Sequence, residues 1–147
     1  MAAMASHLGV VDVRMYAMAA LCALAGNHAI NQERIGDTTG ALGEMVAGME
    51  AHPGDWHVQY QGMSALHVLA RHSVGNQHRM RASPQLLRLV VTAAQILGVE
   101  VHAGAVLTAL GMTGAQASAA AAKVSCHHRH PSRVMLYDRS ASSPTPH

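Results

Sequence analysis

Apolar and polar positions in the first 91 residues follow a pattern that occurs twice. When the segment around Val58–Met80 is shifted back by 45 residues, identical residues align without a gap. The aligned pairs are Val13/Val58, Met18/Met63, Ala20/Ala65, Leu21/Leu66, Leu24/Leu69, Ala25/Ala70, Asn31/Asn76, Gln32/Gln77, Arg34/Arg79, Leu42/Leu87 and Val46/Val91. A register of this length predicts a duplicated structural unit, and a period of about 40–47 residues is typical of stacked helical repeats.

Within each copy the apolar residues recur at three- and four-residue spacing, which predicts helices rather than strands. Gly26-Asn27 is expected to end the helix that begins at Val11, and Thr38 or Thr39 to cap the helix that begins at Ala41. Asp55 is well placed to cap the helix that begins at Trp56. The predicted helices are Val11–Ala25, Ile30–Ile35, Ala41–Ala51, Trp56–Arg71, Val74–Arg81, Gln85–Leu97, Val99–Leu110 and Ala115–Val124. The segment 99–110 is interpreted as a third, degraded copy of the long helix, in a register shortened by a few residues.

Composition supports this all-α interpretation. Hydrophobic residues make up 50% of the 147, yet Phe is absent and aromatic residues are only 3%. A core of Ala, Leu, Val and Met suits closely packed helices, because strands favour aromatic and β-branched residues. We expect residues 1–10 to be a frayed start or the remnant of a helix. We expect residues 125–147, rich in His, Arg, Ser and Pro, to be a disordered tail.

Charge and cysteine content narrow the class of protein. The formal net charge is +2 and charged residues are 12%, so no dense cationic face for nucleic acid is expected. Cys22 and Cys126 form no disulfide framework, which favours a reducing compartment and a cytoplasmic protein. Residues 101–122 are uncharged but rich in Ala, Gly, Thr and Ser, so no membrane span is expected. A signal peptide at Met15–Ala25 is a further alternative, although Asp12 precedes it.

The duplicated units resemble armadillo repeats. In that family a short first helix ends in Ile, a Gly introduces a second helix, and a longer third helix reads close to Ala-Leu-x-x-Leu-x-x-Leu-Ala. The first helix and its glycine are matched by NQERI (31–35) with Gly40, and the second helix by ALGEMVAGM (41–49). The third is matched by VQYQGMSALHVLA (58–70), echoed by VRMYAMAALCALA (13–25). The loop Met49–Pro53 resembles loops of divergent armadillo arrays in protist proteins and leucine-rich repeat kinases.

This resemblance covers about residues 11–112 and leaves HEAT repeats open as an alternative. It implies an all-α fold, a right-handed α-solenoid present as a partial array. The units would be about 11–28, 29–71 and 74–112, followed by an Ala-rich helix at 115–124. The segment before Val11, MAAMASHLGV, is no polar cap. We therefore expect a fragment or relative of a longer array, with neighbouring repeats or self-association at its uncapped ends.

The family binds other proteins through a groove lined by its third helices, so the resemblance implies a protein-binding scaffold without catalysis or cofactor. Peptide-binding members carry an Asn and a Trp on the third helix. The position of the Asn is occupied here by Ala23 and Val68, and the position of the Trp by Ala19 and Ser64. Binding would instead use the side chains that recur every fourth residue, together with Trp56 at the start of a long helix. The candidate protein-binding residues are Met15, Asn27, Trp56, Tyr60, Ser64 and His72. Packing against neighbouring structure is the alternative role for all of them.

Other candidate chemistry is sparse. A second hypothesis is a small metal-responsive protein, because the tail carries residue types that bind zinc or copper, Cys126, His127, His128 and His130. No second Cys/His pair at a matching distance accompanies them, so no native metal is expected. His67 with Asp55 or Glu44 is the one catalytic pair to consider, and no nucleophile motif or phosphate loop supports it. Asn31 and Asn76 recur at one repeat position, which predicts a shared structural role in bonding a carbonyl or capping a helix.

Overall fold

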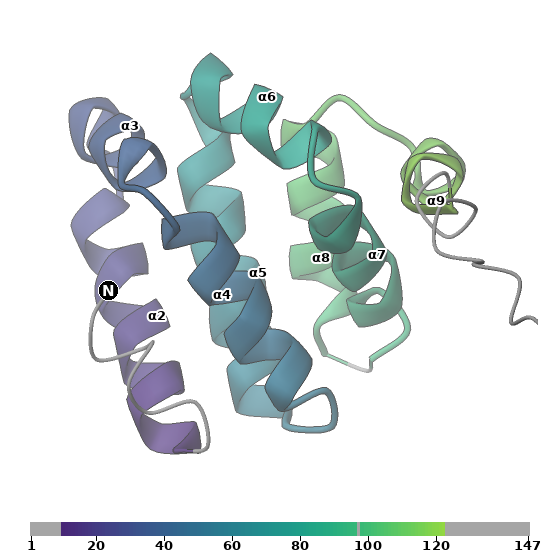
Figure 1. Ribbon diagram of the computed structural model, residues 1–147, viewed down its shortest axis with the longest axis horizontal. Helices are drawn as coiled ribbons and strands as arrows, with labels where there is room; N and C mark the ends of the chain where they lie inside the picture. Colours follow the sequence, from purple (N-terminus) through teal and green to yellow (C-terminus); the bar gives the residue numbers. More distant parts are fainter. Residues whose placement is uncertain (1–9, 97, 123–147) are drawn as a thin grey trace, which may run out of the picture.

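The computed structural model describes residues 10–96 and 98–122, and this part of the chain contains eight α-helices and no strand (Figure 1). The prediction of an all-α protein is therefore confirmed. The helices are α2 (Val11–Ala25), α3 (Ala29–Asp37), α4 (Ala41–Ala51), α5 (Trp56–Arg71), α6 (Val74–Arg81), α7 (Pro84–Ala93), α8 (Glu100–Ala109) and α9 (Gly114–Ala122). The expected frayed start, apart from Val10, and the expected tail at 125–147 lie outside the described residues.

Local capping chemistry sets several helix starts. The Asp55 carboxylate accepts a hydrogen bond from the Val58 amide at 3.0 Å, so the predicted cap of α5 is confirmed. Ser73 and Ser83 cap α6 and α7 in the same way. In α9 the Thr113 amide and the Gln116 amide each bond the other residue's side chain, at 2.8 and 3.2 Å. Each of these side chains satisfies an amide that has no partner within its helix.

Two local predictions are wrong and one is confirmed. Gly40, with a φ of 81°, precedes α4 and no side chain caps that helix; Thr38 instead ends α3, its hydroxyl bonding the Arg34 carbonyl. The helix α2 ends at Ala25 with Gly26 as its C-cap, so its predicted end at Gly26-Asn27 is confirmed, and Asn27 has a left-handed backbone with a φ of 54°. The helix predicted to run to Leu97 ends at Ala93, because tight backbone bonds at 95 and 96 turn the chain towards α8.

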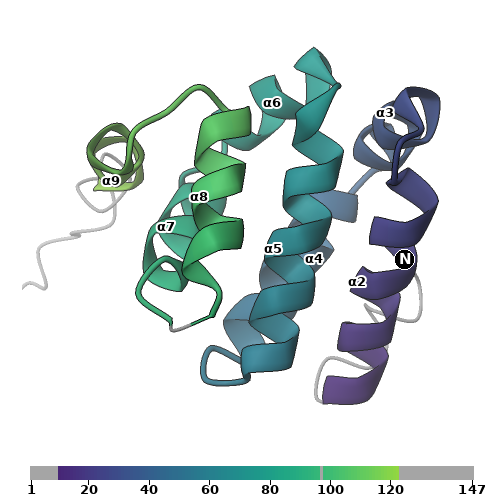
Figure 2. The same cartoon turned by 180° about the vertical axis from the view of Figure 1, so that it is seen from behind.

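The long helices α2, α5 and α8 lie side by side, with α5 in the middle (Figure 2). On the other side of this row, α4 packs against α5, and α7 packs against α8 and α4. The short helices α3 and α6 lie together at one end of the long helices, and α9 packs against α7 (Figure 1). Each long helix of the row therefore has one side left uncovered by the second row.

Methionine and leucine fill the core between the two rows. The large apolar side chains that are less than 2% exposed are Met18, Met45, Met49, Met63, Leu66, Leu69, Met80, Leu86, Leu87 and Leu110. Methionine is unbranched and fills irregular spaces, which suits a core without any Phe. Glycine permits one close approach here: a Cβ on Gly62 of α5 would lie 2.3 Å from the Met49 sulfur of α4.

Burial follows the repeat beyond the duplicated stretch. In α5 the buried positions include Val58, Gly62, Ala65, Leu66 and Leu69. The positions 41 residues later are also buried, and they are Val99, Ala103, Val106, Leu107 and Leu110. Five of the eight buried positions of α5 thus have buried equivalents, in a register four residues shorter than the first period. The equivalents of Gln59, Met63 and Ala70 are exposed, and they are Glu100, Gly104 and Gly111.

Candidate functional site

The six candidate protein-binding residues lie on α2, on α5 and in the turn after each helix. On α5, Tyr60, Ser64 and Val68 are half-buried and follow one another at four-residue spacing, and Tyr60 and Val68 also pack against the core. The repeat register aligns them with Met15, Ala19 and Ala23 on α2, and with Val101, Ala105 and Ala109 on α8. We call the surface made by these nine residues and their neighbours Asn27, Trp56, His67, Arg71, His72 and His102 the three-helix face. Figure 2 shows its three helices side by side.

One end of the three-helix face is aromatic. The Trp56 and Tyr60 rings stack with centroids 5.0 Å apart, and His57 meets Trp56 edge-on at the same centroid distance. Tyr60 also contacts the His102 ring of α8, with centroids 4.4 Å apart. Trp56 reaches the turn before α8, since a Cβ on Gly98 would lie 2.8 Å from the indole nitrogen. The predicted residue Trp56 therefore joins α5 to α8 and keeps 41% of its surface exposed.

The other end is polar. Arg71, at the end of α5, donates from Nη2 to the Asn27 side-chain oxygen at 2.7 Å and from Nε to His72 Nε2 at 2.9 Å. These bonds bring together Asn27 and His72, two of the candidate residues, through an arginine that the sequence analysis did not select. All three side chains are exposed, so this end presents one positive charge and several hydrogen-bonding atoms.

Between the two ends, His67 is half-buried on α5. Burial lowers the pKa of His67 below its ordinary value of 6.5, and Arg71 and then His102 lower it further. Loss of water and nearby positive charge both disfavour the imidazolium form. The middle of the three-helix face thus favours a neutral imidazole and holds small residues, Ala19, Ser64 and Ala105.

Sequence reasoning missed the contribution of α8. His102, Val101 and Arg71 complete the three-helix face, and Val101 is 72% exposed. Val101 could have been found by extending the repeat to α8, because it occupies the position of Tyr60 after the shortened period. The contact between His102 and Tyr60 depends on how closely α8 packs against α5, and no sequence signal gives that distance.

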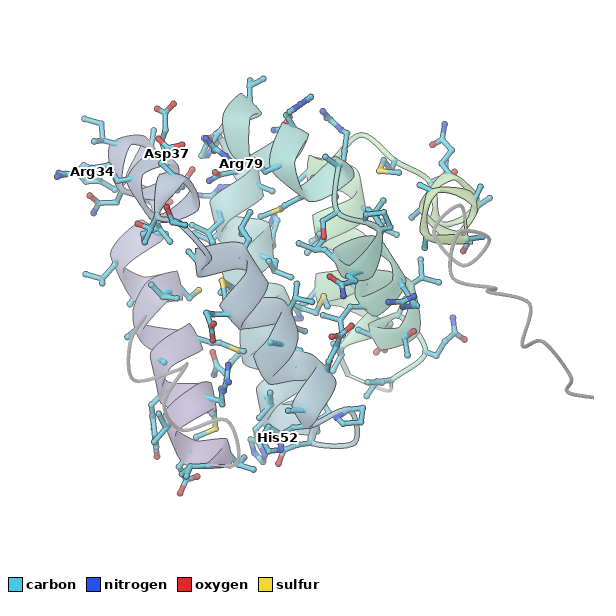
Figure 3. The ribbon with its side chains drawn as sticks, viewed as in Figure 1. Arg34, Asp37, His52 and Arg79 are labelled. Carbon is cyan, nitrogen blue, oxygen red and sulfur yellow. The ribbon has the colours of Figure 1, made fainter. Side chains whose placement is uncertain are left out.

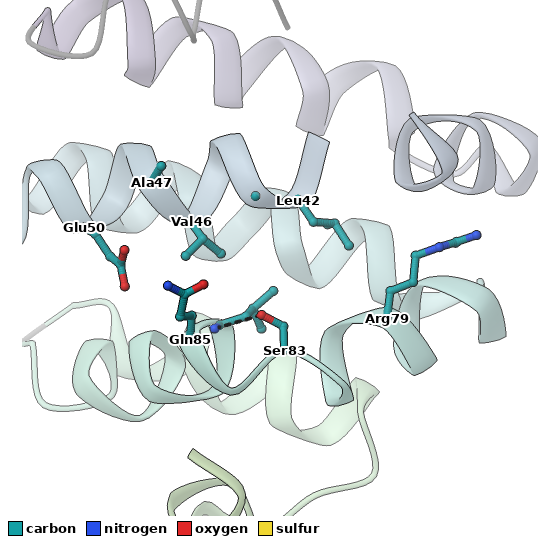
Figure 4. Close-up of a pocket in the computed structure, with 9 residues that line it drawn as sticks. Leu42, Val46, Ala47, Glu50, Arg79, Ser83 and Gln85 are labelled. Carbon is teal, nitrogen blue, oxygen red and sulfur yellow. Dashed lines mark hydrogen bonds between the residues drawn. The ribbon is translucent and has the colours of Figure 1, made fainter. Parts of the chain in front are cut away.

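A second concave surface lies on the opposite row, between α4 and α7. This cleft of about 330 Å³ has an apolar floor of Leu42, Val46 and Leu86. Glu50 and Gln85 face each other at one end and Arg79 lies at the other (Figure 4). Ser83 is committed to capping α7, since its hydroxyl accepts from the Leu86 amide at 3.3 Å. The lining offers apolar surface and hydrogen bonds but no activated nucleophile.

The other candidate chemistry is not assembled in the described residues. Asp55 and His67 lie on one helix about 18 Å apart at 1.5 Å per residue, and Glu44 lies beside Arg14 with 3.8 Å between the charged groups. No group of three or more His, Cys, Asp or Glu side chains that could hold a metal occurs among residues 10–96 and 98–122. The cluster Cys126, His127, His128 and His130 lies outside that part of the chain.

None of the described helices is by itself long and apolar enough to cross a membrane. The pair α8 and α9 together has the length and composition of a span but is bent by 81° at its junction.

No protein-family model matches this chain, and no curated protein or solved structure is significantly similar to it.

Proposed function

We propose that this chain is a non-catalytic scaffold of armadillo-like repeats that binds a protein partner on the three-helix face. The observation that carries the proposal is the recurrence of side-chain hydrogen bonds at the repeat period. Asn31 donates to the Leu24 carbonyl at 2.8 Å, and Asn76 donates to the Leu69 carbonyl at 3.0 Å.

The neighbouring glutamines repeat the same arrangement. Gln32 donates to the Ala25 carbonyl at 3.0 Å, and Gln77 donates to the Ala70 carbonyl at 2.9 Å. Each pair of bonds ties a short helix to the last turn of the long helix before it. Identical contacts in consecutive units support a repeat architecture, in which neighbouring units stack in one direction and their long helices line one surface.

The three-helix face has the composition of a protein-binding surface. Its aromatic end combines Trp56 and Tyr60, and its polar end has Arg71; Trp, Tyr and Arg are the residue types enriched among binding hot spots. The shallow middle of small side chains leaves room for a partner segment. A partner with an apolar or aromatic side chain at one end and a carboxylate at the other would complement both ends.

The test is a comparison of two double variants with the natural chain as affinity baits. Tyr60→Ala with His72→Ala removes groups from both ends of the three-helix face, whereas Glu50→Ala with Gln85→Ala changes the cleft between α4 and α7. Circular dichroism checks that all three chains fold equally. Partners that bind the natural chain and the cleft variant, but not the face variant, are expected. A partner that binds the face variant undiminished would refute this site.

A further inference from the structure

The junction between α3 and α6 shows how one repeat unit packs against the unit before it. We call α6 the receiving helix of this junction. The Asn76 side chain donates to the Gln32 carbonyl of α3 at 2.7 Å, in addition to its bond within its own unit. Arg79 forms an ion pair with Asp37 at the end of α3. Gly36 allows this approach, because a Cβ there would lie 1.7 Å from the Asn76 side-chain oxygen. The receiving helix supplies Asn and Arg, and the helix it receives supplies a carbonyl, a Gly and an Asp.

The outer side of α3 carries the same receiving residues with nothing against them in the described chain. Asn31 and Arg34 occupy the positions of Asn76 and Arg79. Asn31 donates only to Leu24 of its own unit, and Arg34 points away from α6, whereas Arg79 points towards Asp37 (Figure 3). Among the described residues Arg34 has no acidic partner.

A hollow marks this place. It has a volume of about 200 Å³ and is lined by Leu24, Asn31, Arg34 and Ile35. The residues one period later, Leu69, Asn76, Arg79 and Met80, form the inner junction. Leu69 is fully buried, whereas Leu24 is 60% exposed, and Tyr16 of α2 and Ile30 of α3 are 67% and 64% exposed. The hollow and its apolar surroundings are therefore equivalent to the α6 side of the inner junction. The α3 side of that junction shows what kind of segment such a surface binds.

We propose that the outer side of α2 and α3 docks a helical-repeat unit of a partner protein, whose short helix carries glycine followed by aspartate as in Gly36-Asp37. This inference rests on the repeat architecture proposed above. Asn31 would donate to a carbonyl one turn before that glycine, Arg34 would pair with the aspartate, and the partner's long helix would cover Leu24 and Tyr16.

A second copy of this chain does not supply that occupant. Its α3 carries the Gly-Asp pair but is already covered by its own α6. Its α6 carries Arg81 and Ala82 at the corresponding positions, and Arg81 donates to the Leu110 carbonyl at 2.7 Å. An arginine in place of Gly36 would collide with the receiving asparagine, since even a Cβ there lies too close.

The test uses the full chain with residues 11–55 repeated once, so that residue 55 is followed by a second copy of 11–147. This insertion preserves the natural register, and the α3 of the first block becomes the occupant for the second block. We expect a single thermal transition by circular dichroism, with a Tm at least about 5 °C above that of the natural chain. Two separate transitions, or an unchanged Tm, would contradict the proposal.

Matched substitutions locate the effect. Asn31→Ala with Arg34→Ala in the second block is expected to lower the Tm of the repeated chain by about 3 °C or more. The same pair in the first block, whose outer side stays free, is expected to change it by about 1 °C or less. Equal effects in both blocks would overturn the proposal.

Sedimentation of the natural chain over a wide concentration range gives an independent measurement if the repeated chain does not fold. A monomer at all concentrations agrees with the proposal. A dimer that Leu24→Asp dissociates would make a second copy the occupant and overturn it. These readouts report stability and self-association, so they can fail while the Tyr60/His72 binding test succeeds, and the reverse also holds.

Discussion

The segments α2–α3 and α5–α6 are equivalent in the repeat and share several identical residues, but they lie in two different environments. Leu24 and Leu69 are equivalent by the repeat, yet Leu24 is 60% exposed and Leu69 is fully buried. Asn31 bonds one carbonyl of its own unit, whereas Asn76 bonds two carbonyls in two units. Identical residues are thus buried and bonded to different extents in the two copies, because α5–α6 lies between two units and α2–α3 has a described neighbour on one side only.

The largest difference is expected for the leucines. Leu69→Ala removes a fully buried side chain from the core and should lower the free energy of unfolding by about 2–5 kcal/mol. Leu24→Ala should change it by about 0.5 kcal/mol or less, since the side chain already contacts solvent. Urea denaturation followed by circular dichroism measures both. Equal losses would mean that Leu24 is buried in solution.

The asparagines come next. Asn76→Ala removes two buried side-chain hydrogen bonds, to the carbonyls of Gln32 and Leu69, which we expect to cost about 2–3 kcal/mol. Asn31→Ala frees a carbonyl that water can reach, and about 0.5 kcal/mol is expected. Gly36→Ala should reproduce much of the Asn76 effect, because its Cβ would occupy the space of the Asn76 side chain. The comparison fails if Gly36→Ala leaves the urea midpoint unchanged.

The arginines should differ less. Arg79→Ala removes an ion pair whose side chains are 40% and 52% exposed, together with a bond to Asn76, so a loss of about 1 kcal/mol is expected. Arg34→Ala should have no measurable effect on the isolated chain. Repeating the Arg79 measurement at high salt should shrink the loss, because salt screens exposed charges. A loss for Arg34 as large as that for Arg79 would show an undetected partner in the first unit.

The smallest expected effect is the pH dependence of stability that His67 contributes. The equivalent residue in the first unit is Cys22. Burial lowers the pKa of His67 and raises that of the Cys22 thiol, since it disfavours the charged form of each. The folded state therefore binds a proton at His67 less readily than the unfolded chain does. Stability from this residue is complete above pH 6.5 and declines as the pH falls through 6.5 towards the lower folded-state pKa.

The measurement is the urea midpoint at pH 7.5 and at pH 5.5 for the natural chain and for His67→Gln. The variant is expected to lose less stability on acidification, and the difference between the two chains removes the contribution of the other histidines. A variant that loses as much as the natural chain would mean that His67 titrates normally in the fold.

Much of the secondary structure could be predicted because it depends on residues close in sequence. The bounds predicted for α2, α4, α5 and α6 are those observed, and Asp55 caps α5 as expected. Local reasoning failed where backbone geometry decided the outcome. Gly40 starts α4 by adopting a left-handed conformation, and two tight turns end α7 at Ala93, four residues before its predicted end.

The candidate site was predictable only in part. Four-residue spacing placed Tyr60, Ser64 and Val68 on one side of α5, and the repeat extended this stripe to α2. The sequence could not indicate that His102 contacts Tyr60, or that Arg71 joins Asn27 to His72, because these contacts cross between helices. Side chains from separate helices meet at distances that packing sets.

The sequence by itself determined the helices and the recurrence of Asn, Gln, Arg and Leu at one period, because propensity, capping and spacing act within a few residues of chain. Only the tertiary structure decided which copy of each residue is buried. Asn76 bonds both Leu69 and Gln32, whereas Asn31, at the equivalent position of the repeat, bonds only Leu24. Burial depends on which helix packs alongside, and that neighbour comes from a unit 45 residues away.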